Sequence, residues 1–200
     1  YTMPYDSIAK YDVGMRASEV WPGKEQSPAI KPLATELIDS VENYVKANGL
    51  DPMRYNIEIK CRKGKDEGKN WPEYHEFVDK CMELLLSKNL GDRLVVQCFD
   101  ARALNYMHEK YPQVKLSYLI SKKDTDWDTY MGKLNFTPEW LSPEFVIVDQ
   151  AMVDNCRKAG IRLVPWTVDN EADIRRILDL HVEAIITNYP DRVLKITRGY

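Results

Sequence analysis

The repeated alternation of short apolar stretches with amphipathic stretches is the feature of this sequence that most constrains its fold. Strand-like stretches lie at residues 55–60, 93–98, 114–120, 145–148, 161–168 and 183–188. Each is followed by apolar residues at three- and four-residue spacing, which predicts a helix. Such alternation predicts an α/β fold with a parallel sheet and helices outside it, either an open doubly wound sheet or a barrel.

The helices that this pattern predicts begin after a loop-rich leading segment, residues 1–32, where several prolines prevent a long helix. They cover residues 33–47, 72–86, 101–111, 126–134, 150–159 and 170–180, and a last helix is opened by Pro190. Asp100 is the candidate N-cap of one helix, and Asp169 or Asn170 is the candidate N-cap of another. One domain spanning residues 1–200 is expected from the length.

Polar and aromatic side chains collect at the predicted carboxyl ends of the strands, and this distribution favours a barrel. These residues are Glu58, Lys60, Gln97, Phe99, Trp166, Thr187 and Asn188. A (β/α)8 barrel builds its active site from several strand ends at once. A doubly wound sheet more often carries one glycine-rich phosphate loop, and neither GxGxxG nor GxxxxGK[ST] occurs. Five or six βα units predict an incomplete TIM-type (β/α)8 barrel.

Composition and charge limit the classes of binding partner that we expect. The chain has 200 residues, of which 44% are hydrophobic and 30% charged, and its formal net charge is -3. This balance gives no general basic field, so neither nucleic acid nor an anionic membrane is an expected partner. We expect no membrane span and see no signal peptide, and the cellular location stays open. The four cysteines lack zinc-site spacing and are expected to be mostly buried thiols.

The stretch RYNIEIK places two opposite charges on one face of a predicted strand. Residues two apart in a strand share a face, so Glu58 and Lys60 point one way while Ile57 and Ile59 point the other. Two interpretations are open. The pair could form a structural ion pair inside a barrel, or it could belong to a site that needs both charges.

Three segments in fixed order carry a resemblance to a known family. They are NIEIK at 56–60, VPWTVDN at 164–170 and AIITNYPD at 184–191, and they are supported by VVQCFD at 95–100 and IKPLATELIDSV at 30–41. Together they resemble the glycerophosphodiester phosphodiesterase family. The resemblance implies a (β/α)8 barrel and a phosphoric diester hydrolase of lipid and glycerol metabolism. Its implied substrate is a small glycerophosphodiester, which is cleaved to glycerol phosphate and an alcohol with the help of a divalent metal and two histidines.

The resemblance also implies roles for individual residues. Glu58 matches a metal-ligand glutamate, and Lys60 matches the lysine that contacts the phosphate and is the candidate catalytic residue. Trp166 matches the aromatic wall of the glycerol pocket, and Gln97 and Phe99 are further candidates for substrate binding. Chemistry supports the first two roles, because calcium and magnesium prefer carboxylate oxygen and an ammonium group offsets charge on a phosphoryl oxygen.

Other family motifs are missing from this sequence. The His-Arg-Gly, Glu-x-Asp and His-Asp strand ends do not occur, while His75 and His108 fall on predicted helices and His181 falls in a turn. We therefore expect the catalytic histidines to lie outside this chain. Two alternatives to an enzyme portion are a non-catalytic module that binds phosphate and glycerol, and a barrel fragment completed by a partner.

Overall fold

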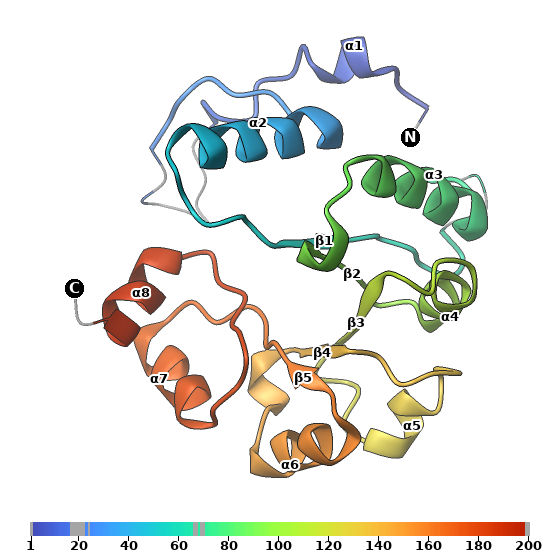
Figure 1. Ribbon diagram of the computed structural model, residues 1–200, viewed down its shortest axis with the longest axis vertical. Coiled ribbons are helices and arrows are strands. Elements are labelled where there is room, and N and C mark those ends of the chain that lie inside the picture. Colours follow the sequence, from blue (N-terminus) through green and yellow to red (C-terminus); the bar gives the residue numbers. More distant parts are fainter. Residues whose placement is uncertain (1, 17–22, 24, 66–67, 69–70, 199–200) are drawn as a thin grey trace. The chain divides into compact units, whose positions relative to one another are not determined.

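A sheet of five parallel strands is the centre of the computed structural model, which describes residues 2–16, 23, 25–65, 68 and 71–198. The strands are β1 (Tyr55–Glu58), β2 (Leu94–Cys98), β3 (Lys115–Ile120), β4 (Trp140–Pro143) and β5 (Arg162–Leu163). Their order in the sheet is their order in the chain (Figure 1). A doubly wound sheet reverses its strand order at a switch point, whereas a barrel wall does not. The predicted barrel-type α/β fold is confirmed, and the sheet is not closed.

The register of the strands separates a polar face from an apolar face. Glu58 is paired with Gln97, and Gln97 with Ser117, so these side chains point to the same side of the sheet. The alternate positions of β2 and β3 carry Val96, Cys98, Leu116, Tyr118 and Ile120, all of them buried. Helix α4 packs against both of these strands. Glu58, Gln97 and Ser117 therefore lie on the opposite face of the sheet, away from α4.

Eight α-helices are formed by the residues that the structure describes. They are α1 (Tyr5–Ile8), α2 (Ala34–Ala47), α3 (Tyr74–Ser87), α4 (Ala101–Lys110), α5 (Trp127–Met131), α6 (Gln150–Ala159), α7 (Glu171–Asp179) and α8 (Pro190–Arg198). Short 3₁₀ helices lie at Gly91–Arg93 and Phe145–Ile147. Asp100 caps α4 as predicted, and the cap of α7 is Asn170, not Asp169. None of the described helices is long and apolar enough to cross a membrane.

The strand predicted at residues 145–148 is wrong. The strand in this part of the chain is β4, and the apolar run after it forms the 3₁₀ helix, in which Val146 is 52% exposed. β4 ends in Pro143, which has no N–H to donate and therefore argues against a central strand. Its carbonyl still takes part in the sheet, since it accepts the N–H of Trp166 at 3.0 Å.

The predicted last strand, residues 183–188, is not a regular strand, although it runs beside the segment that continues β5. The N–H of Ile186 donates to the carbonyl of Pro165, and the N–H of Val168 donates to the carbonyl of Ile186, both at 2.9 Å. Nearer β5, the N–H of Glu183 donates to the carbonyl of Leu163 at 3.2 Å, so three backbone bonds join residues 183–186 to residues 163–168. The end of the VPWTVDN segment and the start of AIITNYPD are thereby held together.

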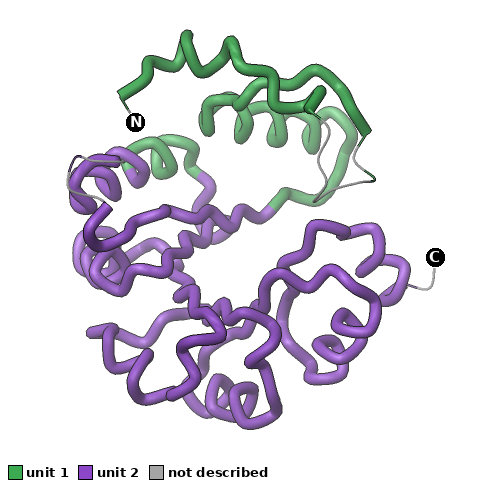
Figure 2. Tube along the Cα trace, turned by 180° about the vertical axis from the view of Figure 1, so that it is seen from behind, with its two compact units in different colours: residues 1–53, 83–89 green, residues 54–82, 90–200 purple. Residues whose placement is uncertain are grey.

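The chain divides into two compact units (Figure 2). Unit 1 consists of residues 1–53 and 83–89, and unit 2 consists of residues 54–82 and 90–200. Unit 1 contains α1 and α2, and Lys88 forms an ion pair of 2.7 Å with Asp39 of α2. Unit 2 contains the whole sheet and therefore every residue proposed for the site. The expectation of a single domain stays a prediction.

Candidate functional site

Glu58 and Lys60 lie together at the carboxyl end of β1. The Nζ atom of Lys60 is 3.6 Å from Oε2 of Glu58. The Lys60 side chain is 75% exposed, whereas that of Glu58 is 27% exposed. Ile59, between them, is buried, and its N–H donates to the carbonyl of Gln97 at 3.0 Å. The buried isoleucine anchors the strand end, so the two charges are presented together on the opposite side.

Gln97 is the neighbour of Glu58 on β2. It is only 9% exposed, and its side-chain oxygen accepts a hydrogen bond of 3.1 Å from the amide of Asn56. Its partner in β3, Ser117, has its hydroxyl 2.7 Å from that of Ser142 in β4. A row of polar groups thus crosses four strands on one face of the sheet, with Glu58 at its end.

Phe99 and Trp166 form the aromatic part of the candidate site. Their ring centroids are 5.5 Å apart, and the rings are nearly perpendicular, in the edge-to-face arrangement that aromatic pairs favour. The indole N–H of Trp166 donates to the carbonyl of Ser142 at 2.7 Å, which fixes the ring at the end of β4. Phe99 is 44% exposed, so part of this aromatic surface faces solvent.

The sequence predictions missed the role of Asp169, which was considered only as a helix cap. Its carboxylate accepts hydrogen bonds from the hydroxyl of Thr187 and from the backbone and side chain of Asn188, at 2.8 to 3.1 Å. Burial works against the charged carboxylate, but the hydrogen bonds from Asn188 and Thr187 lower the pKa of Asp169 below its ordinary value. Asp169 therefore ties the VPWTVDN and AIITNYPD segments together.

A cavity of about 680 Å³ opens beside the carboxyl ends of β2 and β3. The residues that line it include Cys61, Arg62, Lys63, Phe99, Asp100, Arg102 and Tyr118. Phe99 is the candidate site residue that borders this cavity. Three of the lining residues follow Lys60 directly in the chain, so the cavity adjoins the loop that leaves the candidate site.

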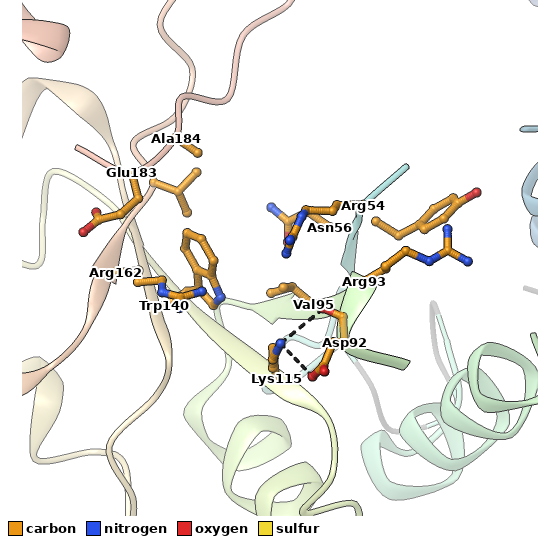
Figure 3. A pocket seen from close by; sticks show the side chains of 12 residues that line it. Arg54, Asn56, Asp92, Arg93, Val95, Lys115, Trp140, Arg162, Glu183 and Ala184 are labelled. Carbon is orange, nitrogen blue, oxygen red and sulfur yellow. Dashed lines mark hydrogen bonds and ion pairs between the residues drawn. The ribbon is translucent and has the colours of Figure 1, made fainter. Parts of the chain in front are cut away.

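A second cavity, of about 430 Å³, lies at the opposite, amino ends of the strands (Figure 3). Arg162 stacks on Trp140 with a separation of 5.2 Å, and Lys115 pairs with Asp92 at 2.8 Å. No candidate site residue lines this cavity. In a barrel, the active site lies at the carboxyl ends of the strands, so we place the candidate site there and not in this cavity.

All three histidines lie away from the strand ends. His75 is in the first turn of α3, where its ring contacts Glu73 at 3.1 Å, and His108 is on α4, stacked on Phe136. His181 follows α7 with a positive φ of 56°. The placement of His75 and His108 on helices and of His181 in a turn agrees with the sequence prediction.

The residues at the candidate site do not by themselves fit a divalent metal. Calcium takes six to eight oxygen ligands, and magnesium takes six in octahedral geometry. Glu58 is the one carboxylate among the predicted site residues, and a lysine ammonium lies beside it. Across the described part of the chain, no three histidine, cysteine, aspartate or glutamate side chains gather as a cation site would require.

The fold and the position of the site define the class of protein: an α/β barrel-type chain with a candidate site at the carboxyl ends of its parallel strands. Comparison with known proteins then gives the family. The profile of the Glycerophosphoryl diester phosphodiesterase family matches residues 2–192. The chain therefore belongs to this family, as the motifs predicted.

Its relatives are distant and longer. A glycerophosphodiester phosphodiesterase of Bacillus subtilis is 26% identical over 96% of this chain and 64% of its own length. One of Caldanaerobacter subterraneus is 24% identical over 96% of this chain and 70% of its own length. The chain thus spans about two thirds of the length of these curated relatives.

Solved structures agree on the fold. A Silicibacter pomeroyi protein that carries the name of this family superimposes with a TM-score of 0.81, at 24% identity, over 98% of this chain and 68% of its own. A phosphodiesterase of Oleispira antarctica, solved with the product sn-glycerol-3-phosphate, gives a TM-score of 0.70 at 20% identity, over 98% of this chain and 70% of its own.

Proposed function

We propose that this chain carries the phosphate- and glycerol-binding part of a metal-dependent phosphodiesterase that hydrolyses glycerophosphodiesters to glycerol phosphate and an alcohol. The observation that carries the proposal is the pair of Glu58 and Lys60, side by side at the carboxyl end of β1 in the motif NIEIK. Membership of the family supports it. So does the Oleispira antarctica relative, which was solved with sn-glycerol-3-phosphate.

In this proposal Lys60 contacts the phosphate. Its exposed ammonium can approach an anionic oxygen, and a fixed positive charge stabilises the charge that grows on a phosphoryl oxygen during hydrolysis. Phe99 and Trp166 provide an apolar wall for the glycerol carbons, and Gln97 provides an amide at the same edge of the sheet.

The metal-dependent part of the proposal needs ligands in addition to the described residues. A bound calcium or magnesium ion would act as a Lewis acid on the phosphate oxygens. Glu58 can supply one carboxylate to such an ion, which is fewer oxygens than either ion requires. The general acid and base are likewise assigned to groups outside this chain, because none of the three histidines lies at a strand end.

The position of the histidines favours a second candidate function, a module that binds phosphate and glycerol without catalysis. A positioned general acid or base contributes about 10² to 10⁴ in rate, so a site without either retains binding and loses turnover. A barrel fragment completed by a partner is the remaining alternative.

Two measurements on the purified chain separate these functions. The first is calorimetric titration with sn-glycerol-3-phosphate, with and without calcium or magnesium, and we expect measurable binding. The second follows the release of glycerol phosphate from glycerophosphocholine, and we expect none from this chain alone. Turnover abolished by replacing His75, His108 or His181 would show that the chain carries its own acid-base group. Absence of both binding and turnover would overturn the proposed function and the binding module together, leaving the barrel fragment.

A further inference from the structure

Two cysteines lie in contact beside the candidate site. Cys98 is the last residue of β2 and is completely buried, and Cys61 follows Lys60 and is 6% exposed. The thiol of Cys61 donates a hydrogen bond to the sulfur of Cys98. The carboxyl ends of β1 and β2, which are paired in register from Tyr55 to Glu58, bring these sulfurs together across 36 intervening residues, 62 to 97.

Backbone donors surround the sulfur of Cys98. The N–H of Asp100 donates to it at 3.3 Å, and the N–H of Cys61 is shared between this sulfur and the carbonyl of Ile59, which lies 3.2 Å from the Cys61 nitrogen. The hydrogen bond from the Cys61 thiol, together with these backbone donors, lowers the pKa of Cys98 below its ordinary value despite its burial. Donors converging on one sulfur stabilise a thiolate, which is the reactive form of cysteine.

The other two cysteines provide an internal contrast. Burial raises the pKa of Cys81 to about 11 and that of Cys156 to about 12, so both stay protonated at neutral pH. Neither borders either of the two cavities. The chain thus holds one pair of thiols in mutual contact and two separate thiols, the partly exposed Cys81 and the buried Cys156, whose raised pKa values disfavour the thiolate.

The cavity beside β2 and β3 gives small molecules access to the pair. Cys61 lines this cavity, together with Arg62 and Lys63. Its volume of about 680 Å³ leaves ample room for a molecule the size of hydrogen peroxide, since one water occupies about 30 Å³ of liquid. The two cationic side chains favour the development of negative charge on a sulfur or on a departing hydroxide.

We propose that Cys61 and Cys98 form an oxidation site that closes to a disulfide when it meets hydrogen peroxide or another small hydroperoxide. The proton of Cys61 passes along the hydrogen bond to the thiolate of Cys98, so Cys61, which lines the cavity, becomes the thiolate. Its sulfur attacks one peroxide oxygen, the O–O bond breaks, and Cys61 becomes a sulfenic acid. The departing hydroxide takes the proton from Cys98 and leaves as water. The thiolate of Cys98 then attacks the sulfur of Cys61, the S–S bond forms, and the second hydroxide leaves and takes up a proton from the solvent. Two thiols are oxidised and one peroxide is reduced.

The position of the disulfide would couple it to the candidate site. Cys61 is bonded directly to Lys60, and in the reduced chain its thiol is hydrogen-bonded to Cys98 at the end of β2. A disulfide has a fixed S–S distance of about 2.05 Å and a narrow range of torsion angles. It would therefore restrain the start of the loop that follows the proposed phosphate contact. The oxidation itself needs no phosphodiester and does not depend on the proposed function.

Peptide mapping of the wild-type chain after peroxide treatment tests the proposal. Remaining thiols are alkylated, the chain is digested, and the peptides are weighed with and without a reducing agent. We expect the peptides of Cys61 and Cys98 to be joined, with the loss of two hydrogen atoms, and separated again by reduction. Both thiols should disappear about tenfold or more faster than those of Cys81 and Cys156.

Two serine variants sharpen the test. Cys61→Ser should prevent the crosslink, whereas the matched control Cys156→Ser, at another buried cysteine, should leave it unchanged. The proposal is overturned if the crosslink is absent from the oxidised wild-type chain, or if Cys81 and Cys156 are oxidised as fast as the pair. Both of these contradicting results are measured on the wild-type chain, so the proposal can be tested even if a serine variant fails to fold.

Discussion

The exposure of Lys60 shows that the ion pair at the end of β1 contributes little to stability. Lys60 is 75% exposed, and its ammonium lies 3.6 Å from Glu58. Ion pairs this exposed contribute about 0 to 1 kcal/mol, because water screens the charges and the side chains lose freedom. A role in stability is therefore a weak reason for a glutamate and a lysine here, and the proposed role in binding has to be tested separately.

Replacement of Lys60 by methionine separates these roles. Lys60→Met should change the free energy of unfolding by less than about 1 kcal/mol, as measured by urea titration. It should weaken binding of sn-glycerol-3-phosphate about tenfold, or about 1.4 kcal/mol, because the phosphate loses a cation. Lys158→Met on α6, which removes another exposed lysine, is the control and should leave binding unchanged. Equal affinity of all three proteins would remove Lys60 from the phosphate contact.

Asp169 is a residue where stability should depend on pH. Asp169→Asn removes a charged acceptor of three hydrogen bonds and should cost about 2 kcal/mol at pH 7. The folded chain lowers the pKa of Asp169, so this stability is fully present above the ordinary aspartate value and is lost as the pH falls through the lower folded value. The difference between wild type and variant should therefore shrink below about pH 4.

Urea titrations at several pH values measure this difference. Asp179→Asn, at an exposed residue that ends α7, is the control and should change the free energy of unfolding by less than about 0.5 kcal/mol. A difference for Asp169→Asn that stays constant down to pH 2 would show that the charge of Asp169 does not stabilise the fold.

Among the elements, α4 begins at a cap that also holds an arginine. Asp100 accepts the N–H of Arg102 at 3.0 Å, and its carboxylate pairs with the guanidinium group at 2.6 Å. Asp100→Ala should lower the free energy of unfolding by about 1 to 2 kcal/mol, because the cap is lost. Asp100→Asn keeps an oxygen that can cap the helix, so most of the stability should remain. Equal losses of unfolding free energy in urea titrations of both variants would mean that the ion pair with Arg102, not the cap, stabilises the start of α4.

Strand β4 depends on a buried pair of hydroxyl groups. Ser117 and Ser142 are completely buried, and their oxygens are 2.7 Å apart. Ser142→Ala should cost about 1 to 3 kcal/mol, because it leaves the hydroxyl of Ser117 buried without this partner. The double variant with alanine at both positions should be less destabilised than the sum of the two single variants. Strict additivity in urea titrations would contradict a direct interaction.

At the scale of the whole molecule, the two compact units differ in how much apolar surface they bury. In α2, the principal helix of unit 1, Ile38 and Val45 are the buried residues, whereas β2 and β3 of unit 2 are buried along most of their length. Hydrogen exchange should therefore be faster for the amides of α2 than for those of β2 and β3, by about tenfold or more. Mass spectrometry of exchanged peptides measures this, and equal protection would show that the chain opens as one cooperative unit.

The sequence by itself determined the features that depend on neighbouring residues. Period-two and helical spacing predicted most strands and helices, and a preceding aspartate predicted the start of α4, because backbone geometry and capping act within a few residues. The placement of Glu58 and Lys60 on one face followed from their separation by a single residue. The family motifs supported the prediction of a barrel-type fold.

Only the tertiary structure decided the features that join distant residues. β4 is a strand because Ser142 and Pro143 find partners in β3 and in the segment after β5, although their residue types argue against a central strand. The bonds of Asp169 to Asn188 and the contact of Cys61 with Cys98 each span more than fifteen residues. Such contacts leave no periodic trace in the chain, because they are selected by packing and by hydrogen bonding between elements that meet only when the sheet has formed.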